Sequence, residues 1–470
     1  MDSITRKEVE GKEFFGRVRT FFTRFKIGTI LRQCNAYKEQ GIPVVTIVLY
    51  LFCLAFRNIS MYMDLTLNKE PAFCKDTVYR LKNSERINWQ RFTLLLSTSI
   101  IIGAVEGLTD ESRRNALILD DSVYRRNRSK AVELLANVYD HANNEYVRGF
   151  RMLTLLWSDG VSRIPVSFCL LSSANEKNRY NEARKVDKRC YGAQIRELAQ
   201  KKSTDVSLEL IAQAKAAKIP AKYVLMDSWF SFPSMITALK KMEFDTIAMV
   251  KKSSKVYYKY QGDLCSVQEI YRRNKKRRGR SKYLLSVEVE VGGEDSIPAR
   301  LVFVRNRNKP SEYLVLLCTD MSLSEEEIIQ LYGKRWDIEV FFKTCKSLLK
   351  LTGECRSLSY SAINAQTAIV FTRYMFLSLT IREDKDLRSA GPLFCLVSEE
   401  LADITFSESM EKLQLFLAKL LAGLNLNLCD IANLAAQLSA DLPPEIANFL
   451  DFRNVQYVKT PAAQPHEAAS

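Results

Sequence analysis

Four polar side chains recur at helical spacing in the stretch LYGKRWDIEVFFKTCKSLLK: Tyr332, Arg335, Glu339 and Lys346. A helix advances about 100° per residue, so on one helix the four would share a sector about 60° wide. Asp337 would lie well outside that sector, so Glu339 is the candidate carboxylate. A carboxylate, two cations and a phenol on one face suit phosphate and metal binding. The alternative is a solvated face with an ordinary Arg–Glu pair.

Two aspartates upstream follow apolar runs of the kind found in buried strands. Asp120 follows Ala-Leu-Ile-Leu, and Asp227 follows Tyr-Val-Leu-Met. Such runs without alternation are typical of central strands covered on both faces, and open α/β sheets place their sites at the strands' C-terminal ends. Strand-end acids also serve as helix caps or turn residues. With Glu339 they would give three oxygen ligands without a nearby His or Cys, which favours Mg²⁺ or Mn²⁺ over zinc.

These residues together resemble a known family. Asp-x-Ser at 120–122, Asp227 after an apolar strand and the spacing Tyr-x2-Arg-x3-Glu-x6-Lys are similar to the DDE transposases of bacterial insertion sequences. The resemblance is closest to the insertion sequence 4 group, whose signature is that spacing, and it covers roughly residues 115–350.

The resemblance implies an activity and roles for the residues. The activity is metal-dependent DNA cleavage at transposon ends, followed by strand transfer into target DNA. The catalytic, metal-binding residues would be Asp120, Asp227 and Glu339, with two Mg²⁺ or Mn²⁺ ions per site. The residues that contact the transposon end would be Tyr332, Arg335 and Lys346. The family's first acid usually precedes a Ser or Thr by two residues, which selects Asp120, with Asp121 as the alternative.

The implied partners are the terminal inverted repeats and target DNA, both double-stranded, bound by a homodimer. Composition agrees with a polyanionic partner, because 69 Lys and Arg face 54 Asp and Glu, for a net charge of +15. Eleven Cys without a CxxC pair favour reduced thiols, and only two His disfavour zinc sites and Ser-His or Cys-His catalysis. The sequence has no Walker loop, so no nucleotide cofactor is expected.

Two further patterns bear on location. The charged N-terminus lacks the apolar core of a secretory signal, and the longest apolar run, residues 44–56, is shorter than the roughly 18 residues of a membrane span. We therefore expect a cytoplasmic, nucleoid-associated bacterial protein without membrane contact.

The predicted fold class is α/β, and the resemblance implies that its mixed sheet core is ribonuclease-H-like. The core would carry an antiparallel β insertion, an N-terminal α-helical domain and a helical C-terminal region. The predicted parts are a helical DNA-binding domain at 1–110, the first part of the catalytic core at 111–250, a β insertion with a basic loop at 251–320, the second part of the core with the Glu339 helix at 321–385, a helical region at 386–459 and a disordered tail at 460–470.

The β insertion carries a dense basic run between residues 272 and 282, with eight cations in eleven residues. Such a run is stable only when it is solvated or faces phosphate. A disordered, solvated loop in the free protein is the alternative, and it is compatible with ordering on DNA. The residues expected to bind DNA are Arg272, Arg273, Lys275, Lys276, Arg277 and Arg278.

Smaller features stay open at this point. Residues 74–92 are compatible with a helix-turn-helix whose helices are capped by Asp76 and Asn88, or with an ordinary helical hairpin. Trp229 is a candidate stacking residue, although packing in the core is the favoured interpretation. Alternative functions are a nuclease of the same fold that does not join DNA, a catalytically silent DNA-binding regulator and a basic RNA-binding protein.

Overall fold

The computed structural model describes residues 15–57, 59–67, 71–109, 113–141, 143–277, 281–306, 309, 312–353 and 356–383. Contacts divide the chain into two compact units, Met1–Gly16 with Val397–Ser470, and Arg17–Leu396. The features described below lie in the second unit. The expected helical region at 386–459 and the tail at 460–470 fall outside the described residues.

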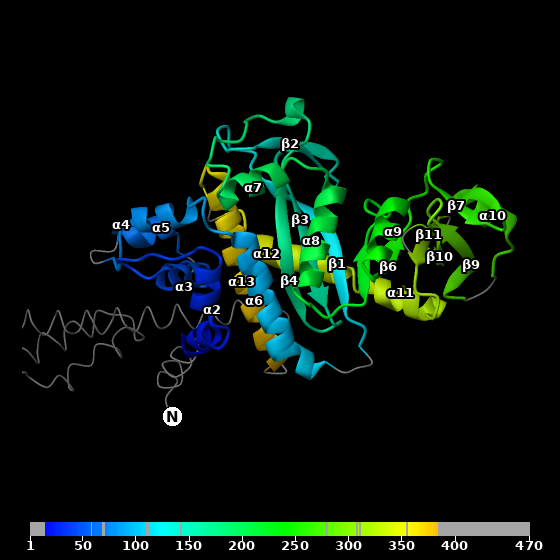
Figure 1. Cartoon of the computed structure of the whole chain (residues 1–470), viewed down its shortest axis with the longest axis horizontal. Helices are drawn as coiled ribbons and strands as arrows, with labels where there is room; N and C mark the ends of the chain where they lie inside the picture. The colour runs from blue at the N-terminus through cyan, green and yellow to red at the C-terminus, as the bar shows by residue number, and fades with distance from the viewer. Residues whose placement is uncertain are drawn as a thin grey trace, which may run out of the picture. The chain divides into compact units, whose positions relative to one another are not determined.

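A mixed sheet forms the core of Arg17–Leu396 (Figure 1). Three of its strands are antiparallel neighbours, β1, β3 and β4, and two more, β5 and β6, continue the sheet in parallel with β1. The order across the core is β4-β3-β1-β5-β6. The strands span Ala116–Arg125 (β1), Glu145–Ser158 (β3), Arg163–Leu171 (β4), Tyr223–Met226 (β5) and Asp245–Met249 (β6). The predicted ribonuclease-H-like mixed sheet is confirmed.

Helices pack on this sheet through apolar side chains. α8 packs against β3 and β4, while α12 packs against β1 and α13 against β4. Phe371 of α13 contacts both Phe168 of β4, at 5.1 Å between ring centroids, and Phe341 of α12, at 4.9 Å. The core helices that follow β4 span Tyr191–Leu198 (α7), Ser203–Ala216 (α8), Pro233–Lys241 (α9), Glu325–Gly333 (α11), Trp336–Ser347 (α12) and Tyr360–Glu383 (α13), with a short 3-10 turn at Glu176–Asn178.

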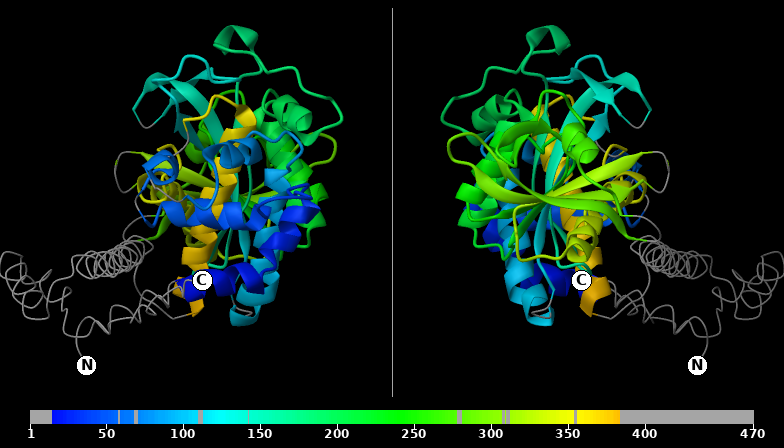
Figure 2. Two further views of the ribbon diagram at one scale, coloured as in Figure 1. Left: turned by 90° about the vertical axis from the view of Figure 1, so that its left-hand side faces the viewer. Right: turned by 90° about the vertical axis from the view of Figure 1, so that its right-hand side faces the viewer.

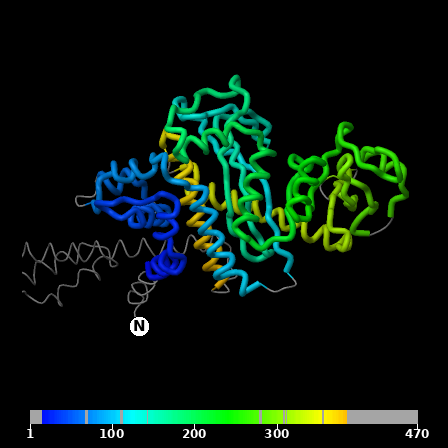
Figure 3. Tube along the Cα trace, viewed as in Figure 1, coloured from blue at the N-terminus to red at the C-terminus, as the bar shows by residue number. Residues whose placement is uncertain are grey.

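The predicted antiparallel β strands of the insertion are present, but they extend the core sheet. β11 pairs antiparallel with β6, with Cys318 opposite Ile247, so the two sheets are continuous. Figure 3 shows the chain leaving the core after β6 and returning through β11, and Figure 2 shows the insertion strands crossing those of the core, as accumulated twist requires. The elements are Tyr257–Tyr260 (β7), Asp263–Ser266 (β8), Val267–Arg273 (α10), Tyr283–Val291 (β9), Ile297–Arg305 (β10) and Tyr313–Cys318 (β11).

The N-terminal part is helical, as expected. Asn88 caps α6 by accepting a hydrogen bond from the Arg91 amide at 2.7 Å, as predicted. The predicted Asp76 cap is wrong: α5 begins at Lys75, two residues earlier than an Asp76 cap would give, and Asp76 lies in its first turn. Residues 15–24 are helical, and the following helices span Ile27–Gln33 (α2), Val44–Leu54 (α3), Met61–Leu67 (α4), Lys75–Lys82 (α5) and Trp89–Ile100 (α6), which continues as a π turn at Ile101–Val105 and a 3-10 turn at Glu106–Leu108.

One helix within the described residues, Trp89–Leu108, is long and apolar enough to cross a membrane by length and composition alone. Its first part, α6, packs against β4 and α13. Trp89, Phe92 and Leu96 are buried there. The apolar face of α6 is therefore used by the protein core.

Arg373 of α13 ties the N-terminal helices to the core. Its guanidinium is fully buried and donates hydrogen bonds to the carbonyl oxygens of Phe52, at 3.0 Å, and Leu349, at 2.9 Å. Phe52 belongs to α3, and Leu349 follows α12, the helix with Glu339. These carbonyl oxygens satisfy the buried charge of Arg373. The contacts therefore hold the C-terminal ends of α3 and α12 against α13.

Candidate functional site

Strand register brings Asp120 and Asp227 together. Parallel pairing of β1 and β5 ends with Leu119 opposite Met226, so the two aspartates follow on neighbouring strands. Asp227 directly follows β5, as predicted. The expectation that Asp120 ends its strand is wrong, because β3 is long enough to pair with β1 as far as Arg125.

Alternation along β1 separates Asp120 from Asp121. Asp120 and Ser122 lie on the side of the sheet that contacts Arg335 and Lys346. Asp121 instead accepts a hydrogen bond from Arg151 on β3. Burial raises the pKa of Asp121, and the Arg151 charge opposes that shift. The side chain of Asp120 is therefore the one that meets the signature residues.

The signature residues lie on two helices, not on the single helix that the spacing predicts. α11 ends at Gly333, and Lys334 and Arg335 form a tight turn before α12. The Arg335 amide bonds the carbonyl of Tyr332 at 2.9 Å, a three-residue spacing. Glycine is a poor helix former, which weakens the helix at this point. Because Arg335 keeps a right-handed helical conformation, the side chains still point to a common region.

Buried contacts, which the sequence did not reveal, fix this turn. Asp337 accepts hydrogen bonds from Ser158, at 2.7 Å, and from Arg163, also at 2.7 Å. Lys334 donates to the carbonyl oxygen of Arg114 at 2.8 Å. These contacts anchor the start of α12 to the ends of β3 and β4, and they occupy the carboxylate of Asp337.

Arg335 joins two of the predicted catalytic carboxylates. Its Nη1 lies 3.0 Å from Oδ2 of Asp120, and its Nη2 lies 2.5 Å from Oε1 of Glu339. The guanidinium is therefore a cation held between a strand carboxylate and a helix carboxylate. The planar fork of arginine suits such a bridge.

The other two signature side chains also face this region. Nζ of Lys346 donates to Oγ of Ser122 at 2.6 Å, and burial lowers the pKa of Lys346 although Asp140 opposes the shift. Among the described residues the buried hydroxyl of Tyr332 has no hydrogen-bond partner of good geometry; burial raises the pKa of Tyr332, and the neighbouring Arg335 opposes that shift. An unsatisfied buried hydroxyl is costly, so Tyr332 is suited to a ligand that accepts or donates a hydrogen bond there.

The electrostatics favour a bound cation. Burial, and then the negative charge of Asp227, raise the pKa of Asp120 to about 7, and Arg335 only partly opposes them. Two neighbouring carboxylates repel each other, and a cation between them relieves the repulsion. A perturbed carboxylate in such a cluster is typical of functional sites.

The carboxylates are not arranged as a preformed metal site. Within the described part of the chain, no three His, Cys, Asp or Glu side chains are grouped closely enough to hold one ion. Arg335 lies between Asp120 and Glu339 and pairs with both carboxylates. The oxygen ligands and the raised pKa of Asp120 suit a hard divalent ion, which Asp120, Asp227 and Glu339 would hold once Arg335 has released the carboxylates.

The basic run belongs to the insertion, and aromatic rings hold several of its side chains. Nζ of Lys276 lies 4.4 Å from the ring centroid of Tyr271, and Cζ of Arg277 lies 4.2 Å from that of Tyr283. Arg273 pairs with Asp263 at 2.9 Å. Arg272 and Arg273 lie in the last turn of α10, and Lys275 lies in the loop after it, whereas Arg278 lies outside the described residues.

A cavity of about 320 Å³ lies in the insertion. Lys275 and Arg277 line it, but so do Glu288 and Glu325, and the hollow does not include the predicted catalytic carboxylates. The mixture of charges does not favour an anion, so the cavity adds nothing to the candidate site.

Trp229 differs from the favoured sequence interpretation. Its side chain is exposed, so the prediction of core packing is wrong. The backbone amide of Trp229 donates to Oδ1 of Asp227 at 2.9 Å, in a turn that points the indole outward. The signal in the sequence was the position of Trp229, two residues after Asp227, the acid that follows β5.

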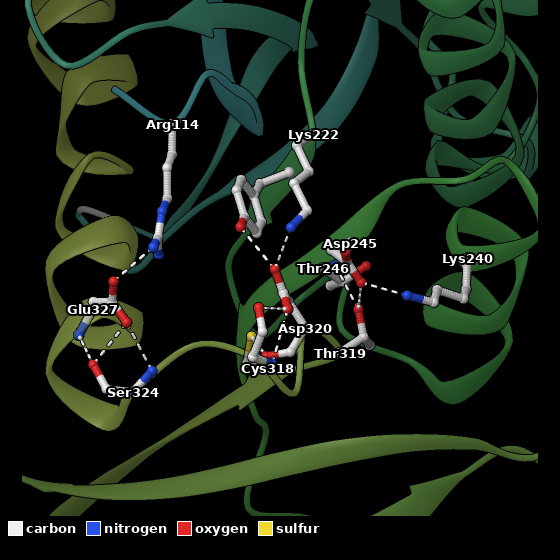
Figure 4. A network of polar contacts seen from close by, with 12 residues as sticks. Arg114, Lys222, Lys240, Asp245, Thr246, Cys318, Thr319, Asp320, Ser324 and Glu327 are labelled. Atoms are coloured by element: carbon white, nitrogen blue, oxygen red, sulfur yellow. Dashed lines mark hydrogen bonds and ion pairs between the residues drawn. The ribbon is translucent and has the colours of Figure 1, made fainter. Parts of the chain in front are cut away.

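A second buried carboxylate, Asp320, lies at the other end of β5 and has a different environment (Figure 4). It accepts hydrogen bonds from Lys222, at 2.6 Å, Tyr223, at 2.8 Å, and Ser322, at 2.6 Å. Burial alone would raise the pKa of Asp320, but these hydrogen bonds outweigh it and hold the pKa far below its usual range. The network ties the turn after β11 to the start of β5.

Comparison with known proteins identifies a family for most of the core. A family model described as DDE superfamily endonuclease matches residues 47–295, which is more than half of the chain. The match includes Asp120 and Asp227 and ends before Glu339. No curated protein matches the sequence.

Proposed function

We propose that this chain, which belongs to the DDE superfamily of endonucleases, is a transposase that cleaves DNA at transposon ends and transfers the ends into target DNA. Endonucleases of this superfamily act on DNA and generally use divalent metals such as Mg²⁺. One observation carries the finer proposal: Asp120 lies beside Asp227 and is joined to Glu339 by Arg335, a member of the insertion sequence 4 signature.

The metal-binding residues in this proposal are Asp120, Asp227 and Glu339. They would hold two Mg²⁺ or Mn²⁺ ions, which when bound supply Lewis-acid activation of the attacking oxygen and stabilisation of the leaving oxygen. Asp120 lies between the other two acids, since it neighbours Asp227 and shares Arg335 with Glu339. It would therefore contribute to both ion positions.

The residues for DNA are Arg335, Lys346 and Tyr332. Once released from the carboxylates, the Arg335 fork would bind a backbone phosphate at the transposon end. Lys346, held by Ser122, would neutralise a second phosphate as a point charge. The unsatisfied hydroxyl of Tyr332 would donate to a phosphate oxygen.

The insertion would extend this DNA contact. Its residues in the proposal are Arg272, Arg273, Lys275, Lys276, Arg277 and Arg278. Rings of Tyr271 and Tyr283 preposition two of these cations and lower the entropy cost of binding. We further propose that two copies act together on the two ends, in the cytoplasm.

A strand-transfer assay with pre-cleaved ends tests this function. The wild type is expected to join labelled, pre-cut element ends to a target plasmid with Mg²⁺ and not with EDTA. Cleavage of uncut ends without any joining would identify a nuclease, and end binding without cutting or joining would identify a silent regulator; either outcome contradicts the proposal.

A further inference from the structure

Four aromatic rings form a continuous row that ends beside Asp227. Tyr146 and Tyr139 are directly opposite on β3 and β2 (Ala136–Asp140), with ring centroids 5.0 Å apart. Tyr139 lies 4.9 Å from His141, and His141 lies 6.0 Å from Trp229. The row therefore leads from an outer hairpin of the sheet to the turn after Asp227.

The rings are not needed to cover a core. The hairpin already has its own apolar cluster, in which Val138 and Val147 are buried with Ala136. Val138 and Val147 are neighbours of the tyrosines along their strands, so their side chains point to the other face of the pair. Tyr146 remains 69% exposed and Trp229 remains 39% exposed. Packing within the described residues therefore does not account for the exposed rings.

Cations flank the end of the row nearest the carboxylates. Cζ of Arg151 lies 5.0 Å from the centroid of the Trp229 ring, and Nζ of Lys251 lies 5.7 Å from it. Arg151 is also held by Asp121, which fixes the guanidinium against the indole. Exposed rings with cations are the combination by which proteins hold unpaired nucleotides, since bases stack on rings and phosphates meet cations.

We propose that the row Tyr146–Tyr139–His141–Trp229 binds unpaired bases of the DNA strand next to the phosphate being cleaved. This inference rests on the proposed function, because it assumes that the cleaved DNA strand passes beside Asp227. A paired base in a duplex has both faces stacked on its neighbours, so only unpaired bases offer the rings a free face. The row thus favours DNA whose end has been opened at the element boundary.

Binding to two DNA probes tests the inference. One probe is a labelled duplex of the element's end; the other has three unpaired nucleotides at the boundary. With EDTA present, fluorescence anisotropy is expected to show about tenfold tighter binding of the opened probe by the wild type. Trp229→Ala and Tyr139→Ala are each expected to lose most of that preference, and Trp229→Phe is expected to retain it within about twofold.

A matched control is Tyr37→Ala, which removes a ring that is 60% exposed but lies outside the row. It is expected to leave the preference for the opened probe unchanged. Equal binding of both probes by the wild type, or full preference in Trp229→Ala, would overturn the inference.

The strand-transfer assay separates this result from the function itself. Joining without a preference for opened DNA would contradict the proposed role of the aromatic row and leave the transposase function intact. A preference that depends on the rings, without any joining, would support the row and contradict the proposed transposase.

Discussion

Asp120 and Asp320 are both aspartates near β5, both are shielded from solvent and both contact a cation, yet their pKa values shift in opposite directions. The pKa of Asp120 rises to about 7, whereas that of Asp320 falls far below its usual range. Asp320 has three hydrogen-bond donors from Lys222, Tyr223 and Ser322. Asp120 has Arg335, shared with Glu339, and the repulsion of Asp227.

The difference separates a carboxylate that stabilises the fold from one that, in our proposal, binds a metal ion. Donors that converge on Asp320 favour its charged form and lower the free energy of the folded state. Around Asp120 the charged form is only partly compensated, so a further cation binds favourably. Replacing each acid in turn should therefore reduce either activity or stability, but not both.

The largest expected effect is on activity. Glu339→Gln and Asp120→Asn are expected to lower the rate of metal-dependent cleavage by about 1,000-fold or more, because each removes a metal ligand. Binding to the element's end should stay within a few-fold. Cleavage rates and gel-shift affinities, measured on the same preparations, check both parts; cleavage at the wild-type rate in either variant would end the assignment of that residue.

Asp320→Asn is expected to reverse this pattern. It should lower the free energy of unfolding by about 3 kcal/mol at pH 7, because Lys222 and Tyr223 lose a buried acceptor, and leave the cleavage rate of the folded protein nearly unchanged. The native pKa of Asp320 is lowered, so its contribution is present above about pH 4 and is lost as the pH falls further. Urea unfolding at pH 7 and pH 3 measures it; an equal deficit at both pH values would contradict the comparison.

Asp120→Asn has the opposite expected effect on the stability of metal-free protein. Since the native pKa of Asp120 is raised to about 7, the stability of the wild type declines as the pH rises from about 4 to about 7. The variant lacks that penalty and should be more stable by about 2 kcal/mol at pH 8, with little difference at pH 4. Denaturation in EDTA at the two pH values measures this difference. A variant that is less stable than the wild type at pH 8 would show that the charged carboxylate of Asp120 is stabilised by its neighbours, as that of Asp320 is.

The smallest effect should come from a partly exposed ion pair in the same region. Arg114 and Glu327 lie 2.6 Å apart, and both side chains are only partly exposed, at 35% and 40% (Figure 4). Arg114→Ala should cost about 0.5 kcal/mol, and less at high salt. A loss of stability as large as that of Asp320→Asn would contradict the expectation that the buried Asp320 contacts stabilise the protein more than the Arg114–Glu327 pair does.

Local elements were predictable from the sequence, because they depend on neighbouring residues. The helical N-terminal part and the strand that precedes Asp227 are present as predicted, and Asn88 caps α6. The break at Gly333 was missed because helical spacing alone continues across it. The extension of β1 beyond Asp120 depends on pairing with β3, which a short apolar run does not report.

The environment of each acid was harder to predict from the sequence than the local elements were. Lys222 and Asp320 are 98 residues apart in the chain, and Arg335 and Asp120 are 215 apart. The sequence supplied candidate acids and their order, but the register between β1 and β5 decides which side chains become neighbours. The exposure of Trp229 likewise follows from the turn after β5 and not from its residue type.

The most direct measurement is cleavage of a supercoiled plasmid that carries the element's own ends, by the wild type and by Asp227→Asn, with Mg²⁺ or with EDTA. We predict cuts at the element boundary only for the wild type with Mg²⁺. Boundary cuts by Asp227→Asn at the wild-type rate, or by the wild type in EDTA, would contradict a metal-dependent site built on the paired aspartates.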